Sequence, residues 1–279
     1  MLTKTNFLSS SSSTLGLMGT AAMAIAISTI EGKADSIAAA PAVRELTADR
    51  PDATEAPITV DQGMFQVEMS FLSYTRNKNA GTTTESYSIA ESNVKYGVSH
   101  NTDLQLVFTP YVSESTQTGG VKTTVEDASD LTVRVKYNLW GNDGGDTALA
   151  LMPNVKIPTS TDVSNGEWEG GVILPFGMAG GENWSLGLQA EISRVADTDS
   201  GGYDWDFSHT AVLGLDVTER VGAYLEYLGV AGDHAYQPFF SGGLTYGVNE
   251  RTQLDAGTMI GLTEAADDLT VFTGITFKF

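Results

Sequence analysis

Apolar and polar residues alternate over long stretches of this chain. Between Leu131 and Leu139 the odd positions hold Leu, Val, Val, Tyr and Leu, whereas the even positions hold Thr, Arg, Lys and Asn. Successive side chains of a β-strand point to opposite faces, so this period of two predicts a strand with one apolar and one polar face.

The same alternation recurs after residue 62 and predicts about twelve strands. These segments run to about ten residues, the length that a tilted strand needs to cross a bilayer, whereas strands of a soluble sandwich are commonly about five or six residues long. We therefore predict an all-β fold, an up-and-down transmembrane antiparallel β-barrel over residues 63–279, with a soluble β-sandwich as the alternative. The apolar positions of the segments begin at Phe65, Ala90, Leu104, Leu131, Leu149, Trp168, Trp184, Trp205, Val221, Phe240, Leu254 and Leu269.

The connections between the segments fall into a compact set and a longer set. Compact turns are expected at sites such as 99–102 and 249–251, and longer loops at 76–84, 113–129 and 158–166. Short turns of an outer-membrane barrel face the periplasm and longer loops face outward, so both termini are expected on the periplasmic side.

Aromatic residues mark the ends of several predicted strands on the apolar face, as in the interfacial girdles of a membrane barrel. The last segment ends with Ile275, Phe277 and Phe279 on one face. This ending is similar to the terminal signal by which the barrel insertion machinery recognises outer-membrane proteins; the alternative is simply a last strand that faces lipid. The other aromatic residues of the set are Trp140, Trp168, Phe176, Trp184, Trp205 and Tyr246.

The first part of the chain has the order of a secretory signal peptide. Lys4 precedes a Ser-rich stretch and an apolar segment from Leu15 to Ile30, which is shorter than the roughly 20 residues of a spanning helix. We expect residues 1–34 to be a signal peptide, with an uncleaved anchor as the alternative, and residues 35–62 to be a periplasmic N-terminal segment. The charged stretch from Asp49 to Glu55 in that segment either enters the periplasmic mouth of the barrel or stays a solvated leader.

Composition excludes several classes of function. The net charge of −20 argues against nucleic acid, whose phosphates would repel such a surface, and the absence of cysteine excludes disulfides, thiol redox chemistry and cysteine-ligated zinc. Hydrophobic residues make up 41% of the chain, which is enough for a folded protein. We find no nucleotide-binding loop or cofactor motif.

If the apolar face of each strand faces lipid, the polar face lines the lumen and carries charge at many positions. Basic residues lie on early strands and most acidic residues on later ones, an arrangement that favours either a field across the lumen or local ion pairs that stopper the barrel. A barrel of about twelve strands is intermediate between filled and open ones, so a narrow or gated pore is expected. The predicted lumen-lining residues are Glu68, Glu91, Lys95, Arg134, Lys136, Lys156, Glu169, Glu191, Asp206, Asp216, Glu226 and Asp255.

Several short motifs resemble one family of outer-membrane β-barrels, the meta-pathway phenol-degradation transporters. The most specific is the stretch 46–55, which reads Leu-Thr-Ala-Asp-Arg-Pro-Asp-Ala-Thr-Glu, and Lys95–Val98 and Pro153–Thr159 resemble the family as well. Ser160 stands where the pattern usually has Gly. The resemblance implies a Gram-negative outer-membrane protein with a transport role and without catalytic residues.

The function expected from these observations is a channel or transporter for small solutes, hydrophobic or aromatic ones being favoured by the family name alone. An alternative is an outer-membrane enzyme of the phospholipase type, but His100, His209 and His234 do not form a charge relay with serine in the predicted arrangement. A third hypothesis is a closed barrel with a structural or adhesive role. The acidic loop around Gly201 misses the EF-hand spacing, so we expect no metal site and no cofactor.

Overall fold

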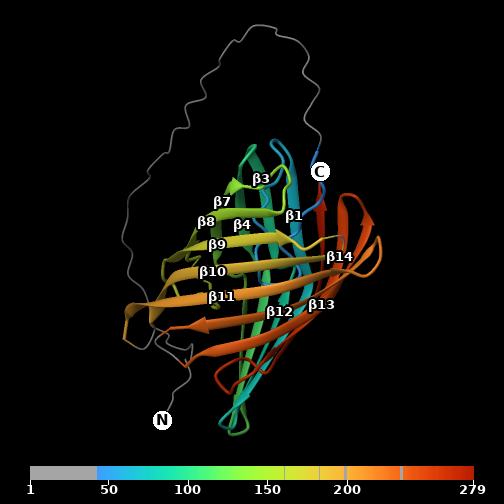
Figure 1. Ribbon diagram of the computed structural model, residues 1–279. Coiled ribbons are helices and arrows are strands. Elements are labelled where there is room, and N and C mark those ends of the chain that lie inside the picture. The colour runs from blue at the N-terminus through green and yellow to red at the C-terminus, as the bar shows by residue number, and fades with distance from the viewer. Residues whose placement is uncertain (1–42, 160, 182, 198–199, 233–234) are drawn as a thin grey trace, which may run out of the picture. The chain divides into compact units, whose positions relative to one another are not determined.

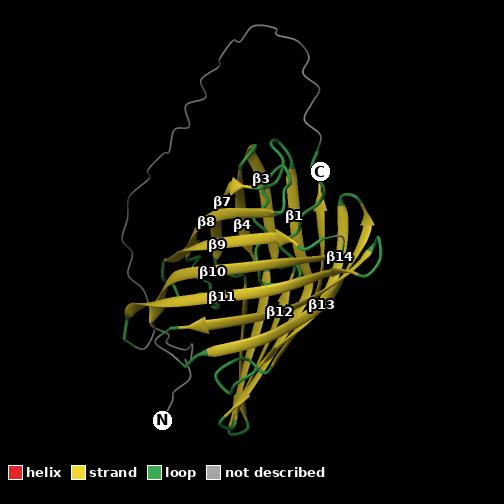
Figure 2. Ribbon diagram, in the orientation of Figure 1, coloured by secondary structure: helices red, strands yellow, loops and turns green. Residues whose placement is uncertain are grey.

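The computed structural model describes residues 43–159, 161–181, 183–197, 200–232 and 235–279. Residues 44–279 form one compact unit built of strands, turns and irregular segments (Figure 2). In this part of the chain no helix has the length and apolar character of a membrane span. The expected signal peptide, residues 1–34, lies outside the described residues.

The strands form one antiparallel sheet that closes on itself, because the last strand pairs with the first from Gln66 opposite Lys278 to Arg76 opposite Leu269 (Figure 1). Three wall strands are each divided into two labelled pieces, β2 with β3, β4 with β5 and β6 with β7. The fifteen labelled strands therefore make a wall of twelve, as predicted, and closure excludes a sandwich. The strands are β1 (Phe65–Asn79), β2 (Thr82–Ile89), β3 (Ser92–Ser99), β4 (Thr102–Phe108), β5 (Tyr111–Thr118), β6 (Val121–Asp127), β7 (Leu131–Trp140), β8 (Thr147–Ile157), β9 (Glu169–Ala179), β10 (Trp184–Asp197), β11 (Gly202–Asp216), β12 (Val221–Ala231), β13 (Gln237–Asn249), β14 (Thr252–Gly261) and β15 (Leu269–Lys278).

Burial in the wall is the reverse of that in a soluble protein. In β7 the side chain of Lys136 is 1% exposed and its neighbour Tyr137 is 47% exposed. The most deeply buried large side chains of the described residues include Lys95, Lys136, Glu68 and Glu226, whereas large apolar side chains are exposed along nearly every strand. Such a surface is stable only where lipid covers it, so the alternation read from the sequence corresponds to a lipid face outside and a polar face inside.

Four neighbouring wall strands bend at the same level. β1 has an irregularity between Ser70 and Leu72, and the other three strands are interrupted at 90–91, 109–110 and 128–130. Ala90 has a positive φ of 57°, and Pro110 lacks the N–H that a ladder requires. The bend divides the sheet into the barrel wall and a four-stranded extension of β1, β2, β5 and β6.

Two of the segments expected to be longer loops belong to this extension and are paired strands. Residues 76–84 form the end of the β1–β2 hairpin, with a turn at 80–81, and residues 113–129 contain most of the β5–β6 hairpin, with a turn at 119–120. The prediction of loops there was wrong because serine, threonine and charged residues occupy both faces of these strands, so no apolar period of two is visible. Antiparallel pairing satisfies their backbone groups without an apolar face.

Candidate functional site

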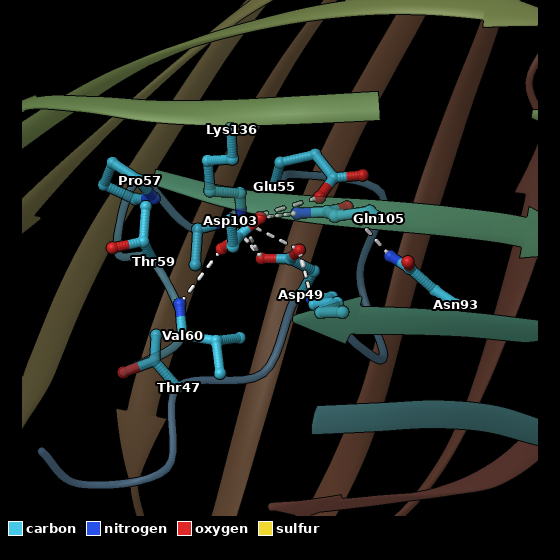
Figure 3. Close-up of polar contacts among 12 residues, drawn as sticks. Thr47, Asp49, Glu55, Pro57, Thr59, Val60, Asn93, Asp103, Gln105 and Lys136 are labelled. Atoms are coloured by element: carbon cyan, nitrogen blue, oxygen red, sulfur yellow. Dashed lines mark hydrogen bonds and ion pairs between the residues drawn. The ribbon is translucent and has the colours of Figure 1, made fainter. Parts of the chain in front are cut away.

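Residues 44–62 lie inside the lumen and contact inward-facing side chains from around the wall; we call them the plug segment. At its centre Asp49 binds two lysines, Lys95 on β3 and Lys136 on β7, the strands that flank β4. Its Oδ2 accepts a hydrogen bond from Lys95 Nζ. Its Oδ1 accepts one from Lys136 Nζ at 2.9 Å (Figure 3). Glu68 also binds Lys95 and accepts the Asp49 main-chain N–H at 3.0 Å. Two ammonium groups and two carboxylates thus neutralise one another where water is excluded.

The next residue of the plug segment, Arg50, binds inward-facing side chains of β14 and β1. Arg50 donates from Nη2 and Nε to the two oxygens of Asp255 at 2.7 and 3.1 Å, and from Nη1 to Ser70 Oγ at 2.6 Å. A Cβ at Gly274 would lie 2.5 Å from Arg50 Nη2, so only glycine leaves room for the guanidinium. This bidentate pair fixes the direction of the chain, because guanidinium and carboxylate match in only a few geometries.

Beyond Arg50 the main chain itself is bound by the wall. The Ala53 N–H donates to Glu226 Oε2 at 2.9 Å, and the Glu55 N–H donates to Gln189 Oε1 at 2.7 Å. Thr54 Oγ1 donates to Glu226 at 2.7 Å and lies 2.6 Å from Thr210 Oγ1. An irregular segment has no ladder of its own, so these wall side chains satisfy backbone groups that would otherwise be buried without partners.

The segment leaves the lumen at the end where the short turns lie. The Thr59 N–H donates to Asn142 Oδ1 at 3.0 Å. The Val60 N–H donates to Asp103 Oδ2, also at 3.0 Å (Figure 3). A Cβ at Gly97 would lie 2.0 Å from the Asp61 carbonyl oxygen, so glycine is required for this close approach.

Asp61 then joins the start of the segment to the last strand. Its carboxylate binds Arg44 Nε at 2.8 Å and Lys278 Nζ at 3.2 Å. Burial raises the pKa of Asp61, but the hydrogen bonds from Arg44 and Lys278 outweigh burial and hold the pKa below its ordinary value.

Half of the predicted lumen-lining residues bind the plug segment. Arg134 pairs with Glu55 at 2.6 Å, and the other five have the contacts given above. The ion-pair partners of Lys95 are Asp49 and Glu68. The residues that bind the segment are Glu68, Lys95, Arg134, Lys136, Glu226 and Asp255.

The remaining predicted residues lie away from the plug segment. Lys156 binds Glu169 at 2.8 Å and Asp130 at 3.4 Å. Glu191 accepts a hydrogen bond from Ser193 Oγ. Asp216 is exposed at the end of β11, near the short turn to β12. The carboxylate of Asp206 lies against Gly232, where an added Cβ would meet its Oδ1. Glu91 lines the second of the cavities described next.

Two cavities meet at the Glu55–Arg134 ion pair. One, of about 290 Å³, is lined by wall residues of β7 to β10, among them Asn154, Lys156 and Glu191. The other, of about 270 Å³, is lined by Asp52, Glu91 and Asn93 together with plug residues. Within the described residues, the side chains of Asp52 and Glu91 form no hydrogen bond or ion pair, whereas Arg50, Arg134 and Lys156 are all paired. Acidic residues therefore outnumber basic ones around the second cavity, whereas the first, which Arg194 also lines, has equal numbers of each.

The sequence reasoning did not indicate which neutral and acidic residues of the wall and its turns bind the plug segment. Asp103, Asn138, Asn142, Gln189 and Thr210 all bind its backbone or its side chains. Asp103 and Gln105 alternate with Leu104 and Leu106, so the inward parity was visible, but nothing in that pattern indicates what an inward side chain binds.

The histidines lie in places that do not resemble a hydrolase site. His100 pairs with Asp143 in exposed turns, and His209 faces outward, where Nε2 is 3.1 Å from the Tyr236 hydroxyl. His234 lies outside the described residues. In the described part of the chain no cluster of three or more metal-ligating side chains is present.

The family described as "Putative MetA-pathway of phenol degradation" matches residues 48–279, from the plug segment to the last strand. The chain belongs to this family. No curated protein matches it. Among solved structures, an outer membrane channel from Pseudomonas putida F1 is 14% identical, covering 84% of this chain and 100% of its own, with a TM-score of 0.59.

Two other solved barrels show how widely this architecture is shared. The NanC porin is 10% identical, covering 77% of this chain and 100% of its own, with a TM-score of 0.50. The translocator domain of the autotransporter NalP from Neisseria meningitidis is 8% identical, covering 78% and 89%, also with a TM-score of 0.50. At such identities the likeness concerns the fold, which is that of outer-membrane barrels. The family and this fold place the protein in the outer membrane.

Proposed function

We propose that the protein is a non-catalytic outer-membrane channel for small solutes, in which the plug segment narrows the lumen and sets the conductance. The observation that carries this proposal is the use of the wall's buried charges. Lys95, Lys136, Glu226 and Asp255 each bind an irregular segment of the same chain. Glu68, which pairs with Lys95, binds the main chain of that segment as well. A wall needed for structure alone would be filled more stably by packed apolar side chains than by buried ion pairs.

The route for solute leads through the two cavities to the Glu55–Arg134 pair. Water and small polar solutes reach cavities of this size, and the plug segment separates them from the short-turn end. Conduction then requires either that solute pass beside Glu55 and Arg134 or that the segment leave its seat. The polar lining favours hydrophilic or ionic solutes, and only the family description connects the chain with phenol degradation.

The charge of the cavities supports a preference for cations. Glu91 lines the second cavity without a basic partner, and an unpaired carboxylate in a narrow lumen attracts cations and repels anions. Burial, together with nearby carboxylates such as Glu226, raises the pKa of Asp52 well above its ordinary value, so Asp52 adds little to this charge. The barrel insertion machinery is expected to recognise the last strand together with the exposed Phe279 that follows it.

Planar-bilayer recordings of the refolded chain test this proposal. We expect a small conductance whose reversal potential in a KCl gradient shows cation preference, and we expect that preference to fall in Glu91→Gln. Glu219→Gln, in the exposed short turn between β11 and β12, is the matched control and should leave selectivity unchanged. A barrel that inserts but passes neither ions nor sugars in liposome swelling would overturn the channel function.

A further inference from the structure

The four-stranded extension has an outer face whose rows run straight across β1, β2, β5 and β6; we call it the outer panel. The row nearest the barrel is Leu72 opposite Ile89, which is opposite Tyr111. All three side chains are exposed. Thr75 faces inward, where its hydroxyl hydrogen bonds to Thr270. The even-numbered residues of this part of β1, which alternate with it, therefore face outward. The panel therefore begins as a continuation of the lipid face.

The next row is aromatic and partly polar. The rings of Tyr74 and Tyr87 pack at an interplanar angle of 39° with centroids 4.9 Å apart, and the Tyr74 hydroxyl donates to Glu85 at 2.8 Å. Tyrosine has an apolar ring and a polar tip, which suits the boundary between acyl chains and headgroups. Row two thus marks the lipid–water interface on this side of the barrel.

The outermost row ends in a lysine at each side. Lys78 is opposite Thr83, Thr83 is opposite Gln117, and Gln117 is opposite Lys122. Lys78 lies four residues beyond Tyr74, or about 14 Å along the strand at ~3.4 Å per residue, and three strand spacings of ~4.8 Å separate the two lysine backbones by about 14 Å. From the barrel outward the rows of the panel are apolar, aromatic, mixed in charge at Arg76 and Glu85, and cationic. This order complements the acyl chains and the anionic phosphate of a phospholipid or glycolipid.

The chain has few basic residues, and more than half of those in the described range form ion pairs. The sequence has 15 Lys and Arg, of which two precede residue 43, leaving thirteen in the described range, and seven of those form ion pairs. Lys78 and Lys122 are exposed and form no ion pair within the described residues. The acidic residues of the panel, Glu85 and Glu126, lie in rows nearer the barrel. The outermost row therefore presents two ammonium groups without ion pairs in the described part of the chain, with the neutral Thr83 and Gln117 between them. Asp268, on the β15 side of this row, accepts the Lys78 main-chain N–H at 2.7 Å.

We propose that the outer panel binds the phosphate-bearing headgroup of an outer-leaflet glycolipid. Lys78 and Lys122 contact phosphate, Thr83 and Gln117 donate hydrogen bonds between them, and the acyl chains lie along Leu72, Ile89 and the tyrosines. Lysine suits this task because its apolar stem lies along the panel while its ammonium group reaches the headgroup. The long hairpins thereby hold the mouth of the barrel in the lipid leaflet.

Binding of purified lipid A to the detergent-solubilised protein, followed by native mass spectrometry or thermophoresis, tests the proposal. We expect K78Q/K122Q to raise the apparent Kd at least about tenfold, and K78R/K122R to restore binding, because phosphate attracts either cation. The matched control is R220Q/R251Q, which removes two exposed basic residues from the short turns and should change Kd less than about twofold.

Dephosphorylated lipid A separates headgroup recognition from simple acyl contact. The unaltered protein should bind it as weakly as K78Q/K122Q binds the phosphorylated form. Equal affinity for the two lipids, or equal loss in the panel and control variants, would overturn the proposal. Heat-modifiable gel mobility confirms that each variant is a folded barrel, and the readout is independent of conductance, so it does not depend on the proposed channel function.

Discussion

Replacement of Asp49 by asparagine should release the plug segment while the barrel stays folded. Asp49 is the carboxylate that Lys95 and Lys136 share, and its Oδ1 also accepts the Ala56 N–H at 2.8 Å. Asparagine keeps the size and an acceptor oxygen but removes the charge. With the segment seated, Lys95 then retains Glu68, whereas Lys136 retains only Glu55 at 3.9 Å.

The magnitude follows from what happens to the lysines in the two states. When the plug segment is out of the lumen, water hydrates both ammonium groups, so loss of the Asp49 charge costs little free energy in that state. When the segment is seated, both lysines are buried, each about 1% exposed, and the loss is costly. Removing one member of a buried pair costs about 3–5 kcal/mol, and the remaining carboxylates place this case near the lower end. A loss of about 3 kcal/mol raises the unseated population roughly 150-fold.

Cysteine labelling measures that population directly, because the chain contains no cysteine. Val60 is buried and its side chain forms no hydrogen bond, so Val60→Cys reports unseating through its rate of reaction with a maleimide. In that background D49N should accelerate labelling by about two orders of magnitude. Asp143→Asn, in an exposed turn, is the control and should not change the rate. Labelling in D49N within twofold of the parent would refute the reasoning.

Other predictions concern the short-turn end of the lumen. Gly97→Ala should displace the segment at Asp61 and speed labelling at position 60, whereas Gly247→Ala, whose added Cβ would lie 3.8 Å from its nearest neighbour, should not. The pKa of Asp61 is held below its ordinary value, so ionised Asp61 stabilises the seated plug segment. This stabilisation is complete above about pH 4 and is lost as pH falls through the lowered pKa. Labelling as a function of pH in an acid-tolerant thiol assay should therefore rise at low pH, and Asp61→Asn, which loses the charge contacts with Arg44 and Lys278, should flatten that dependence.

The barrel could be predicted from the sequence because its wall repeats one simple signal. In β7 each inward Arg134, Lys136 and Asn138 follows an outward apolar residue, and the lipid face requires that pattern over every spanning strand. The extension beyond the bend gave no such signal, since the outward Ser113 and Ser115 of β5 are as polar as their inward neighbours. Strand pairing there depends on backbone hydrogen bonds and on the neighbouring hairpin.

The plug segment could not be predicted because its seat is assembled from residues far apart in the sequence. Arg50 meets Asp255 and Ala53 meets Glu226, contacts that span 205 and 173 positions. Reading Asp49 to Glu55 as a solvated leader was equally consistent with their composition. Charged inward residues indicate that a partner or water must be present, but composition does not distinguish solute, water and a segment of the same chain.

Single-channel conductance of T54C/T210C tests the central claim, that the plug segment controls passage, most directly. The two threonine hydroxyl oxygens lie 2.6 Å apart, so the paired sulfurs can form a disulfide that ties the segment to β11 in an otherwise cysteine-free chain. We predict a low, steady conductance when the pair is oxidised and larger, fluctuating openings after reduction, with Thr54→Cys alone insensitive to reductant. An oxidised channel that conducts as well as the reduced one would contradict the account.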